Sequence, residues 1–274
     1  MTFPSFILYA LLLLQFSLGS NALEIINEKI LKDDHNNVVK SDEDQDGYFT
    51  LDPSLNVFFK ITDLYLGNKI SVFFASNDDS TSTRLRSKQD VDSIPFSLSK
   101  LPYLLKYFSF SNTSSQAKAM ETTLKQCEIK AIGGEVKTCV TSIESMLEMI
   151  HHFFGMVKPK VLATKVLSSK HTLFQNYTFV EKPIEINFSK VIACHTMAYP
   201  YLVYYCHGHK EGHKNRVFKI ALGGDNKERV EAIAVCHMDT SSWDRHHVSY
   251  RLLGVQPGSP VCHVLPLYNV LWFA

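Results

Sequence analysis

The N-terminal stretch of the chain is apolar without interruption by charge. Ile7 to Leu18 is mostly hydrophobic, and Ser20-Asn21-Ala22 follows with the small residues of a signal-peptidase site. The apolar run is shorter than the roughly 20 residues that a membrane-spanning helix needs. We therefore expect residues 1–22 to be a secretory signal peptide, and no later stretch is long enough to be a transmembrane segment.

After this segment the composition becomes polar and acidic, and then becomes globular. Residues 23–56 contain few apolar positions and are acidic, with Asp42, Asp44 and Asp46 near their centre. Such a composition predicts a flexible pro-segment or linker rather than a packed core. From Val57 onward the composition becomes globular, so residues 57–274 are expected to fold as a domain.

Hydrophobic periodicity in the first part of this domain predicts two strands followed by helices. Val57–Phe59 and Ile70–Phe74 read as strands, and Leu98–Phe108 and Ser115–Gln126 read as helices. The sequence that begins at Thr141 is typical of a capping box with Glu144 as its acidic member, so a third helix is expected there. Apolar residues then recur at helical spacing and are expected to face the core: Ile143, Met146, Leu147, Ile150 and Phe154.

From about Val161 the chain changes to short runs rich in β-branched and aromatic residues, which favour strands. Gly223–Asn226 supplies a turn between two of them. The fold class expected is therefore α+β, with a helical middle followed by a β-rich C-terminal half. The expected strands are residues 177–180, 191–193, 202–205, 217–220, 232–235 and 248–250.

The charge balance argues against a nucleic-acid-binding protein, and the glycosylation triplets are typical of a secreted one. The chain has 28 Lys and Arg against 27 Asp and Glu, so it lacks the basic field expected of a nucleic-acid-binding protein. Asn112, Asn176 and Asn187 each begin an Asn-x-Ser/Thr triplet, which is the acceptor for N-glycosylation in secreted proteins.

The cysteines predict disulfides. The chain has 6 cysteines, an even number, and in an oxidising compartment such cysteines pair. Cys127 and Cys139 are close in sequence, so we expect them to bond to each other. The other four would form two bridges among themselves, and the sequence does not choose among their three pairings: Cys194, Cys206, Cys236 and Cys262.

These last four cysteines are each followed by histidine, and 10, 28 and 24 residues separate the successive pairs. Several pairs end an apolar run that reads as a strand, and adjacent strand residues point to opposite faces. The cysteines could therefore form two disulfides in one layer while the imidazoles gather in another. The four dipeptides are Cys194-His195, Cys206-His207, Cys236-His237 and Cys262-His263.

Two uses of these histidines remain open. They could hydrogen-bond the backbone and hold the loops around the disulfides, or they could bind Cu(II) or Zn(II), which accept imidazole ligands. A zinc site shared by Cys and His is disfavoured, because adjacent strand residues cannot easily chelate one ion and the usual ligand spacing is absent. Protonation in an acidic compartment would compete with metal binding.

The spaced dipeptides resemble those of the plant BURP-domain family. Phe58-Phe59 is similar to the di-phenylalanine that opens that domain, Ala232–Trp243 resembles an internal signature, and Trp272 has a counterpart near the C-terminus. The resemblance covers about 57–274. The short acidic segment and Tyr205–Lys210 are most similar to the unknown-seed-protein-like branch.

The resemblance implies a secretory-pathway plant protein of the storage vacuole or cell wall, acting in seed or plant development or in the stress response, usually without established enzymatic activity. Its partners would be vacuolar or wall components. Some relatives are instead copper-dependent peptide cyclases that cross-link a Tyr or Trp side chain in a core peptide. By that analogy, copper would be bound by His195, His207, His237 and His263.

Two further residues bear on the cyclase alternative. His247 matches a family position, although an ordinary hydrogen-bonding role is equally open to it. Tyr48 in the acidic segment is the residue that self-cyclisation could use, and a peptide on another chain is the other candidate substrate. The non-enzymatic function is the favoured expectation.

Overall fold

The computed structural model describes residues 57–74, 85–131, 134–168, 172–209 and 215–274. The expected signal peptide and acidic segment lie outside these residues. Within the described residues, no helix combines the length and apolar character that crossing a bilayer requires. The fold described below is that of the region predicted to be globular.

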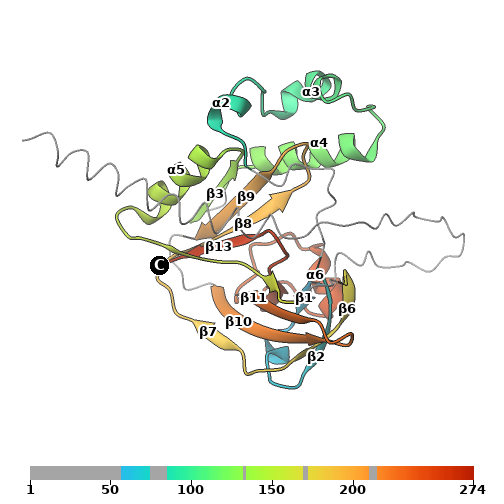
Figure 1. Ribbon diagram of the computed structural model, residues 1–274, viewed down its shortest axis with the longest axis vertical. Helices are drawn as coiled ribbons and strands as arrows, with labels where there is room; N and C mark the ends of the chain where they lie inside the picture. The colour runs from blue at the N-terminus through green and yellow to red at the C-terminus, as the bar shows by residue number, and fades with distance from the viewer. Residues whose placement is uncertain (1–56, 75–84, 132–133, 169–171, 210–214) are drawn as a thin grey trace, which may run out of the picture. The chain divides into compact units, whose positions relative to one another are not determined.

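An eight-stranded sheet forms one layer of the fold (Figure 1). Its described strand pairs are antiparallel, and the main path runs β1, β12, β11, β10, β6, β2, with β5 beside β11 and β7 beside β10. The strands are β1 (Phe58–Phe59), β2 (Lys69–Phe73), β5 (Lys165–Val166), β6 (Phe174–Phe179), β7 (Ile184–Ile186), β10 (Asn215–Gly224), β11 (Arg229–His237) and β12 (Val261–Val264).

A five-stranded antiparallel sheet forms the second layer, in the order β3, β9, β8, β13, β4. Its middle strands β8 and β9 are adjacent in sequence, whereas β13 comes from the C-terminus. The strands are β3 (Glu135–Val140), β4 (Lys160–Leu162), β8 (Val191–Met197), β9 (Val203–His209) and β13 (Val270–Phe273).

The two sheets share an apolar core. Val191 and Leu271 of the five-stranded sheet pack with Val217, Ile233 and Val235 of the eight-stranded sheet. These residues alternate with residues that face the opposite side of each sheet, as strand geometry requires. On β10, for example, Phe218, Ile220 and Leu222 belong to a separate core. Each sheet is therefore apolar on both faces where it is covered, which explains the continuous apolar run of Ala232–Cys236 in β11.

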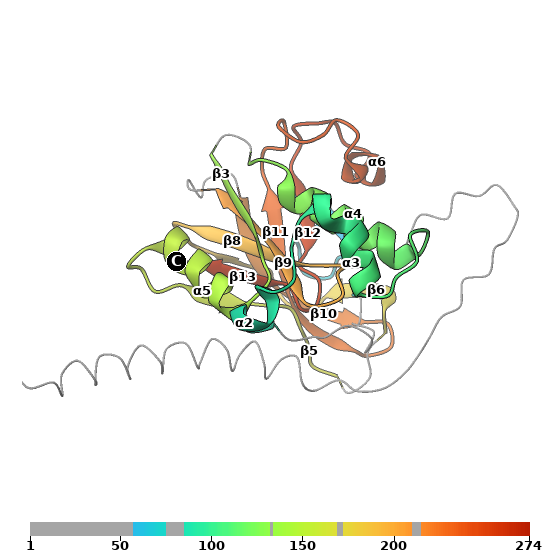
Figure 2. The same cartoon turned by 90° about the horizontal axis from the view of Figure 1, so that it is seen from above.

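Helices cover part of the five-stranded sheet (Figure 2). Leu104 of α3 and Met120 and Leu124 of α4 pack with Val203, the first residue of β9, and with Tyr201 just before it. Pro102 lies in the first turn of α3, where its missing N–H costs no hydrogen bond. The described helices are α2 (Lys88–Val91), α3 (Leu101–Tyr107), α4 (Ser115–Glu128), α5 (Ile143–Phe154), α6 (Val248–Leu253) and the 3₁₀ turns η2 (Ile61–Asp63) and η3 (Leu98–Lys100).

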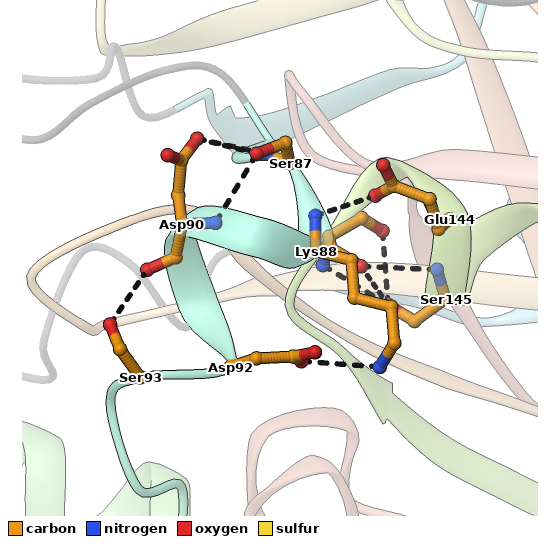
Figure 3. A network of polar contacts seen from close by, with 8 residues as sticks. Ser87, Lys88, Asp90, Asp92, Ser93, Glu144 and Ser145 are labelled. Carbon is orange, nitrogen blue, oxygen red and sulfur yellow. Dashed lines mark hydrogen bonds and ion pairs between the residues drawn. The ribbon is translucent and has the colours of Figure 1, made fainter.

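The α+β expectation is confirmed, with corrections to local elements. The α5 cap is displaced by one residue from the expected Thr141. Ser142 Oγ accepts from Ser145 N at 3.1 Å, and Ser145 Oγ accepts from Ser142 N at 3.0 Å. Glu144 instead accepts a hydrogen bond from Lys88 N at 2.8 Å and so connects α5 to α2 (Figure 3). Ser145 takes the capping role because, with Ser142 as the N-cap, it occupies the third helical position that Glu144 would have held in the expected register.

The buried face of α5 also differs from the expected one. Met146 and Phe154 are buried as predicted, but Met149 and Phe153 join them, while Leu147 is 40% exposed. Both stripes have helical spacing, so the periodicity alone could not choose between them. Packing against the rest of the domain selects the face.

Residues 248–250, expected to be a strand, begin α6 instead. His247 Nδ1 accepts from Ser249 N at 3.4 Å, and Gly254 ends the helix in a left-handed conformation with φ of 61°. Tyr250 Oη also donates to Thr240 O at 2.9 Å. A side-chain cap, a glycine terminus and a tertiary hydrogen bond therefore outweigh the strand propensity of the sequence.

Three disulfides connect these elements. Cys127 bonds to Cys139, the pair expected from the sequence, and links α4 to β3. The two remaining bonds settle the open pairings, because each joins directly opposite residues of neighbouring antiparallel strands: Cys194 with Cys206 across β8 and β9, and Cys236 with Cys262 across β11 and β12.

Replacing both Cys127 and Cys139 by alanine is expected to destabilise the domain by about 3 kcal/mol, because the unfolded chain regains the entropy of a short closed loop. Urea unfolding of the purified protein, with and without the substitutions, measures the difference. If reductant destabilises the double variant as much as it does the wild type, the effect resides in the other two disulfides and this estimate is wrong.

Candidate functional site

Strand register brings the first two dipeptide histidines together. Cys194 lies opposite Cys206, so His195 and His207 lie diagonally across the disulfide on the other face of the β8–β9 pair. Their ring centroids are 5.3 Å apart. Both cysteines have no exposed surface. The disulfide and the imidazoles therefore occupy opposite faces of the same two strands.

The second pair repeats this arrangement on the other sheet. Cys236 lies opposite Cys262, and His237 and His263 lie diagonally across that disulfide. Their rings stack, with centroids 5.4 Å apart and an angle of 17° between planes. The Nε2 atoms of the two rings are 3.4 Å apart, within hydrogen-bond distance, with donor and acceptor set by the tautomer of each ring.

The two pairs meet between the sheets. The ring centroids of His195 and His263 are 5.9 Å apart, which brings an imidazole of each sheet into contact range. A small cavity of about 10 Å³ lies among them, roughly the size that holds one water molecule. Its lining consists of Val191, Ala193, His195, His207, Asn215, Val235, His237, His263 and Leu271.

His247 lies beside this cluster rather than in the cavity lining. Its Nδ1 is 2.7 Å from Ser249 Oγ, and the ring caps α6. The Trp243 ring lies 4.6 Å from it, and the Phe58 ring makes edge contacts with both His247 and His263 at 5.8 and 6.2 Å. The helix-capping contact accounts for the position of His247.

Aromatic residues near the imidazoles were not singled out as site residues from the sequence. Tyr205 stacks on His207, with centroids 5.2 Å apart, and Trp243 contacts His237 edge-on at 5.0 Å. Tyr205 directly precedes a dipeptide, so strand alternation places it two residues from His207 on the same face. Trp243 belongs to a loop, and only its place in the Ala232–Trp243 signature could have indicated it.

Outer partners face the Nδ1 atoms of three rings. Glu135 Oε1 is 3.8 Å from His207 Nδ1, and the Val264 carbonyl oxygen is 3.3 Å from His263 Nδ1. Asn269 Nδ2 is 3.5 Å from His195 Nδ1. The Nδ1 edges therefore face the surrounding protein.

The surroundings favour neutral imidazoles. Burial, with additional repulsion from His207 and His263, holds the pKa of His195 well below its usual range. Burial also lowers the pKa of His263, although the Val264 carbonyl opposes that effect. Atoms of both sheets surround these rings, while each residue keeps a partly exposed edge. A neutral ring offers a lone pair, which is the form that binds metal.

The donor set fits a metal ion that accepts imidazole. The described residues include no free cysteine, so thiolates do not compete with the histidines. The Nε2 separation of 3.4 Å is close to the roughly 3.3 Å between two imidazole nitrogens that bind one tetrahedral ion. Among the described side chains, however, no three His, Cys, Asp or Glu residues form a preformed metal-ligating group. The rings converge in pairs, so a site that binds one ion with more than two of them is not preformed.

The three expected glycosylation sites all have exposed side chains, at Asn112, Asn176 and Asn187. Asn176 differs from the others because it lies within β6. Its Oδ1 accepts from Ser71 Oγ at 2.6 Å, and its Nδ2 donates to Asp225 Oδ2 at 3.4 Å. A glycan at this position would have to displace these two contacts.

Comparison with known proteins identifies the class. Residues 57–274 match the BURP domain model, so the chain belongs to the BURP-domain family. The chain is 46% identical over 235 residues to the BURP domain protein USPL1 of Arabidopsis thaliana, covering 83% of each chain. It is 47% identical to the BURP domain-containing protein BNM2A of Brassica napus, covering 83% of this chain and 82% of the relative. These similarities agree with the unknown-seed-protein-like branch.

The domain also occurs in a longer and less similar protein. The chain is 33% identical over 226 residues to the BURP domain protein RD22 of Arabidopsis thaliana, covering 81% of this chain but 57% of that protein. The domain is therefore common to plant proteins of different length.

The lowered histidine pKa values predict a pH dependence for the metal-free protein. Stability should be highest above the ordinary histidine pKa of about 6.5 and should fall as the pH drops below it, because the unfolded chain then binds more protons than the folded chain. Urea unfolding between neutral and mildly acidic pH measures the slope. His195→Gln should flatten it, with His152→Gln on the surface of α5 as the matched control. Equal slopes in the wild type and His195→Gln would contradict the prediction.

Proposed function

We propose that this chain is a secretory-pathway BURP protein whose four dipeptide histidines form a copper-binding centre. It acts in seed or plant development or in the stress response, in a storage vacuole or the cell wall, and it is not an enzyme. The proposal rests on family membership for the setting and on the imidazole cluster for the chemistry.

One observation carries the metal-binding part of the proposal. Four imidazoles that are far apart in sequence surround a cavity of about 10 Å³, and two sheets supply them in equal number. Histidines that only held loops around the disulfides would not need to converge from both sheets. Imidazole donors without thiolates suit Cu(II), and Zn(II) is the competing ion.

A second candidate function is oxidative cross-linking of a peptide. The observation that favours it is the contact of Tyr205 and Trp243 with rings of the cluster, which shows that an aromatic side chain fits beside the imidazoles. Bound copper would supply one-electron chemistry. Joining a Tyr or Trp side chain to another peptide atom removes two hydrogens, which dioxygen would accept. The chain itself would hold the peptide and the metal.

Copper binding can be tested directly on the secreted mature protein. We expect Cu(II) to bind with an electron paramagnetic resonance spectrum that shows imidazole nitrogen couplings. His207→Ala should weaken binding by about tenfold or more, because one ligand is lost. The disulfides should remain intact, as checked by non-reducing peptide mapping. His152→Ala serves as the control for loss of a surface histidine. Unchanged affinity in His207→Ala would remove that residue from the ligand set.

A peptide cyclase would form a new covalent cross-link when loaded with copper, whereas a non-enzymatic protein would not. A non-enzymatic protein incubated with Cu(II) in air should keep its mass, apart from changes confined to cysteine peptides. Peptide-mapped mass spectrometry before and after copper loading checks this, with attention to the peptide containing Tyr48. A mass lower by two hydrogens on that peptide, together with cross-link fragments, would reverse the assignment in favour of a cyclase.

A further inference from the structure

Glu135 lies next to the imidazole cluster on a neighbouring strand. It is the first residue of β3, the edge strand that pairs with β9, and its side chain is 15% exposed. In the β3–β9 register, Lys137 lies opposite His207 and Glu135 lies opposite His209. Glu135 is therefore diagonal to His207 on the same face of the sheet.

The carboxylate of Glu135 approaches the Nδ1 atom of His207, a residue that also lines the shared cavity. Glu135 Oε1 is 3.8 Å from Nδ1, which is longer than a hydrogen bond and is an ion pair only when the ring is protonated, so beside a neutral ring the carboxylate acts through its charge. A carboxylate at this position favours a proton on Nδ1, and the lone pair then resides on Nε2. Carboxylates that do this for metal-binding histidines fix the ring orientation and raise its basicity.

The Nδ1 atoms of His263 and His195 have neighbours that differ chemically from the carboxylate beside His207. The Val264 carbonyl is a neutral acceptor for His263 Nδ1, and Asn269 presents its Nδ2, a donor, to His195 Nδ1. Asn269 Oδ1 accepts from Thr196 N at 2.7 Å, which fixes the orientation of the amide. The arrangement at His207 therefore differs in charge from that at His263 and in hydrogen-bond direction from that at His195.

One ring contact restricts the His207 ring, and a disulfide anchors the strand that carries Glu135. Tyr205 stacks on the face of His207 at an angle of 28°, and Lys137 Nζ lies 5.9 Å from the centroid of the Tyr205 ring. The Cys127–Cys139 disulfide attaches β3 to α4. The carboxylate is thus on a covalently anchored strand, as a positioning role requires.

We propose that Glu135 is a positioning residue that orients His207 and makes its Nε2 the nitrogen that binds metal. This inference rests on the proposed copper centre and deepens it, because it assigns the ligand atom and a residue outside the ligand set that selects it.

The test uses the mature protein with intact disulfides and three variants. Glu135→Ala removes the acceptor, Glu135→Gln keeps an acceptor without the charge, and Glu181→Ala removes an exposed glutamate outside the cavity lining. Competition titration should give Cu(II) affinities in the order wild type, Glu135→Gln, Glu135→Ala, with a loss of about 10- to 100-fold in the last. Glu181→Ala should match the wild type.

Pulsed electron paramagnetic resonance supplies a readout that general loosening of the structure would not reproduce. In a copper-bound imidazole, the quadrupole coupling of the remote nitrogen reports the hydrogen bond at that nitrogen. One remote-nitrogen signal should change in Glu135→Ala and return toward the wild-type value in Glu135→Gln.

The outcomes separate the inference from the proposed function. If the wild type binds copper through imidazole but Glu135→Ala has the same affinity and remote-nitrogen signal, the positioning role is wrong and the copper centre stands. If the wild type itself shows no imidazole-bound copper, both fail. Should Glu135→Ala not fold, the Glu135→Gln affinity and signal decide the question, and values equal to the wild type overturn the inference.

Discussion

The alternation of side chains along a strand is the constraint on which the candidate site depends. A cysteine and the histidine after it cannot face the same way in an extended strand, so bonding two cysteines across a sheet turns the two histidines to the other side. The Cys194–Cys206 and Cys236–Cys262 bonds join residues whose Cα atoms are partners in register. A shift of either strand pair by one residue would reverse these faces, and the disulfide excludes that shift.

Packing of the two sheets brings the histidines that strand alternation exposes on each sheet into one cluster. Each sheet alone would present a pair of imidazoles, and the shared apolar core, which includes Val191, Ile233 and Leu271, brings the pairs face to face. The same burial that stabilises the core keeps His195 and His263 neutral. The protonation state of these imidazoles therefore depends on how tightly the sheets pack. A looser interface would admit water and favour the charged form of the rings.

The sequence predicted that each cysteine and its following histidine face opposite sides of a strand, but it did not predict every helix correctly. The α+β layout and the Cys127–Cys139 bond followed from periodicity and spacing, as did the separation of cysteines from histidines. The pairing of the other four cysteines could not be predicted, because it depends on which strands become neighbours, a property of the whole sheet. The buried face of α5 and the helix at Val248 were missed since tertiary contacts decide between patterns that are locally equivalent. Glu135 could not have been singled out either, because it lies 72 positions before His207 in the chain and reaches it through the β3–β9 pairing.

The cross-strand disulfides also determine which side-chain atoms remain available as ligands in the folded domain. Before oxidation, each dipeptide offers a thiolate beside an imidazole, and soft metal ions prefer the thiolate. In the oxidised domain the four cysteines have no exposed surface and lie on the face of each sheet opposite its histidines, while the imidazoles line the cavity. Oxidation thus both aligns the rings and removes a competing set of ligands. In the copper centre proposed above, disulfide formation before metal binding would therefore leave imidazole nitrogens as the ligands of the cluster.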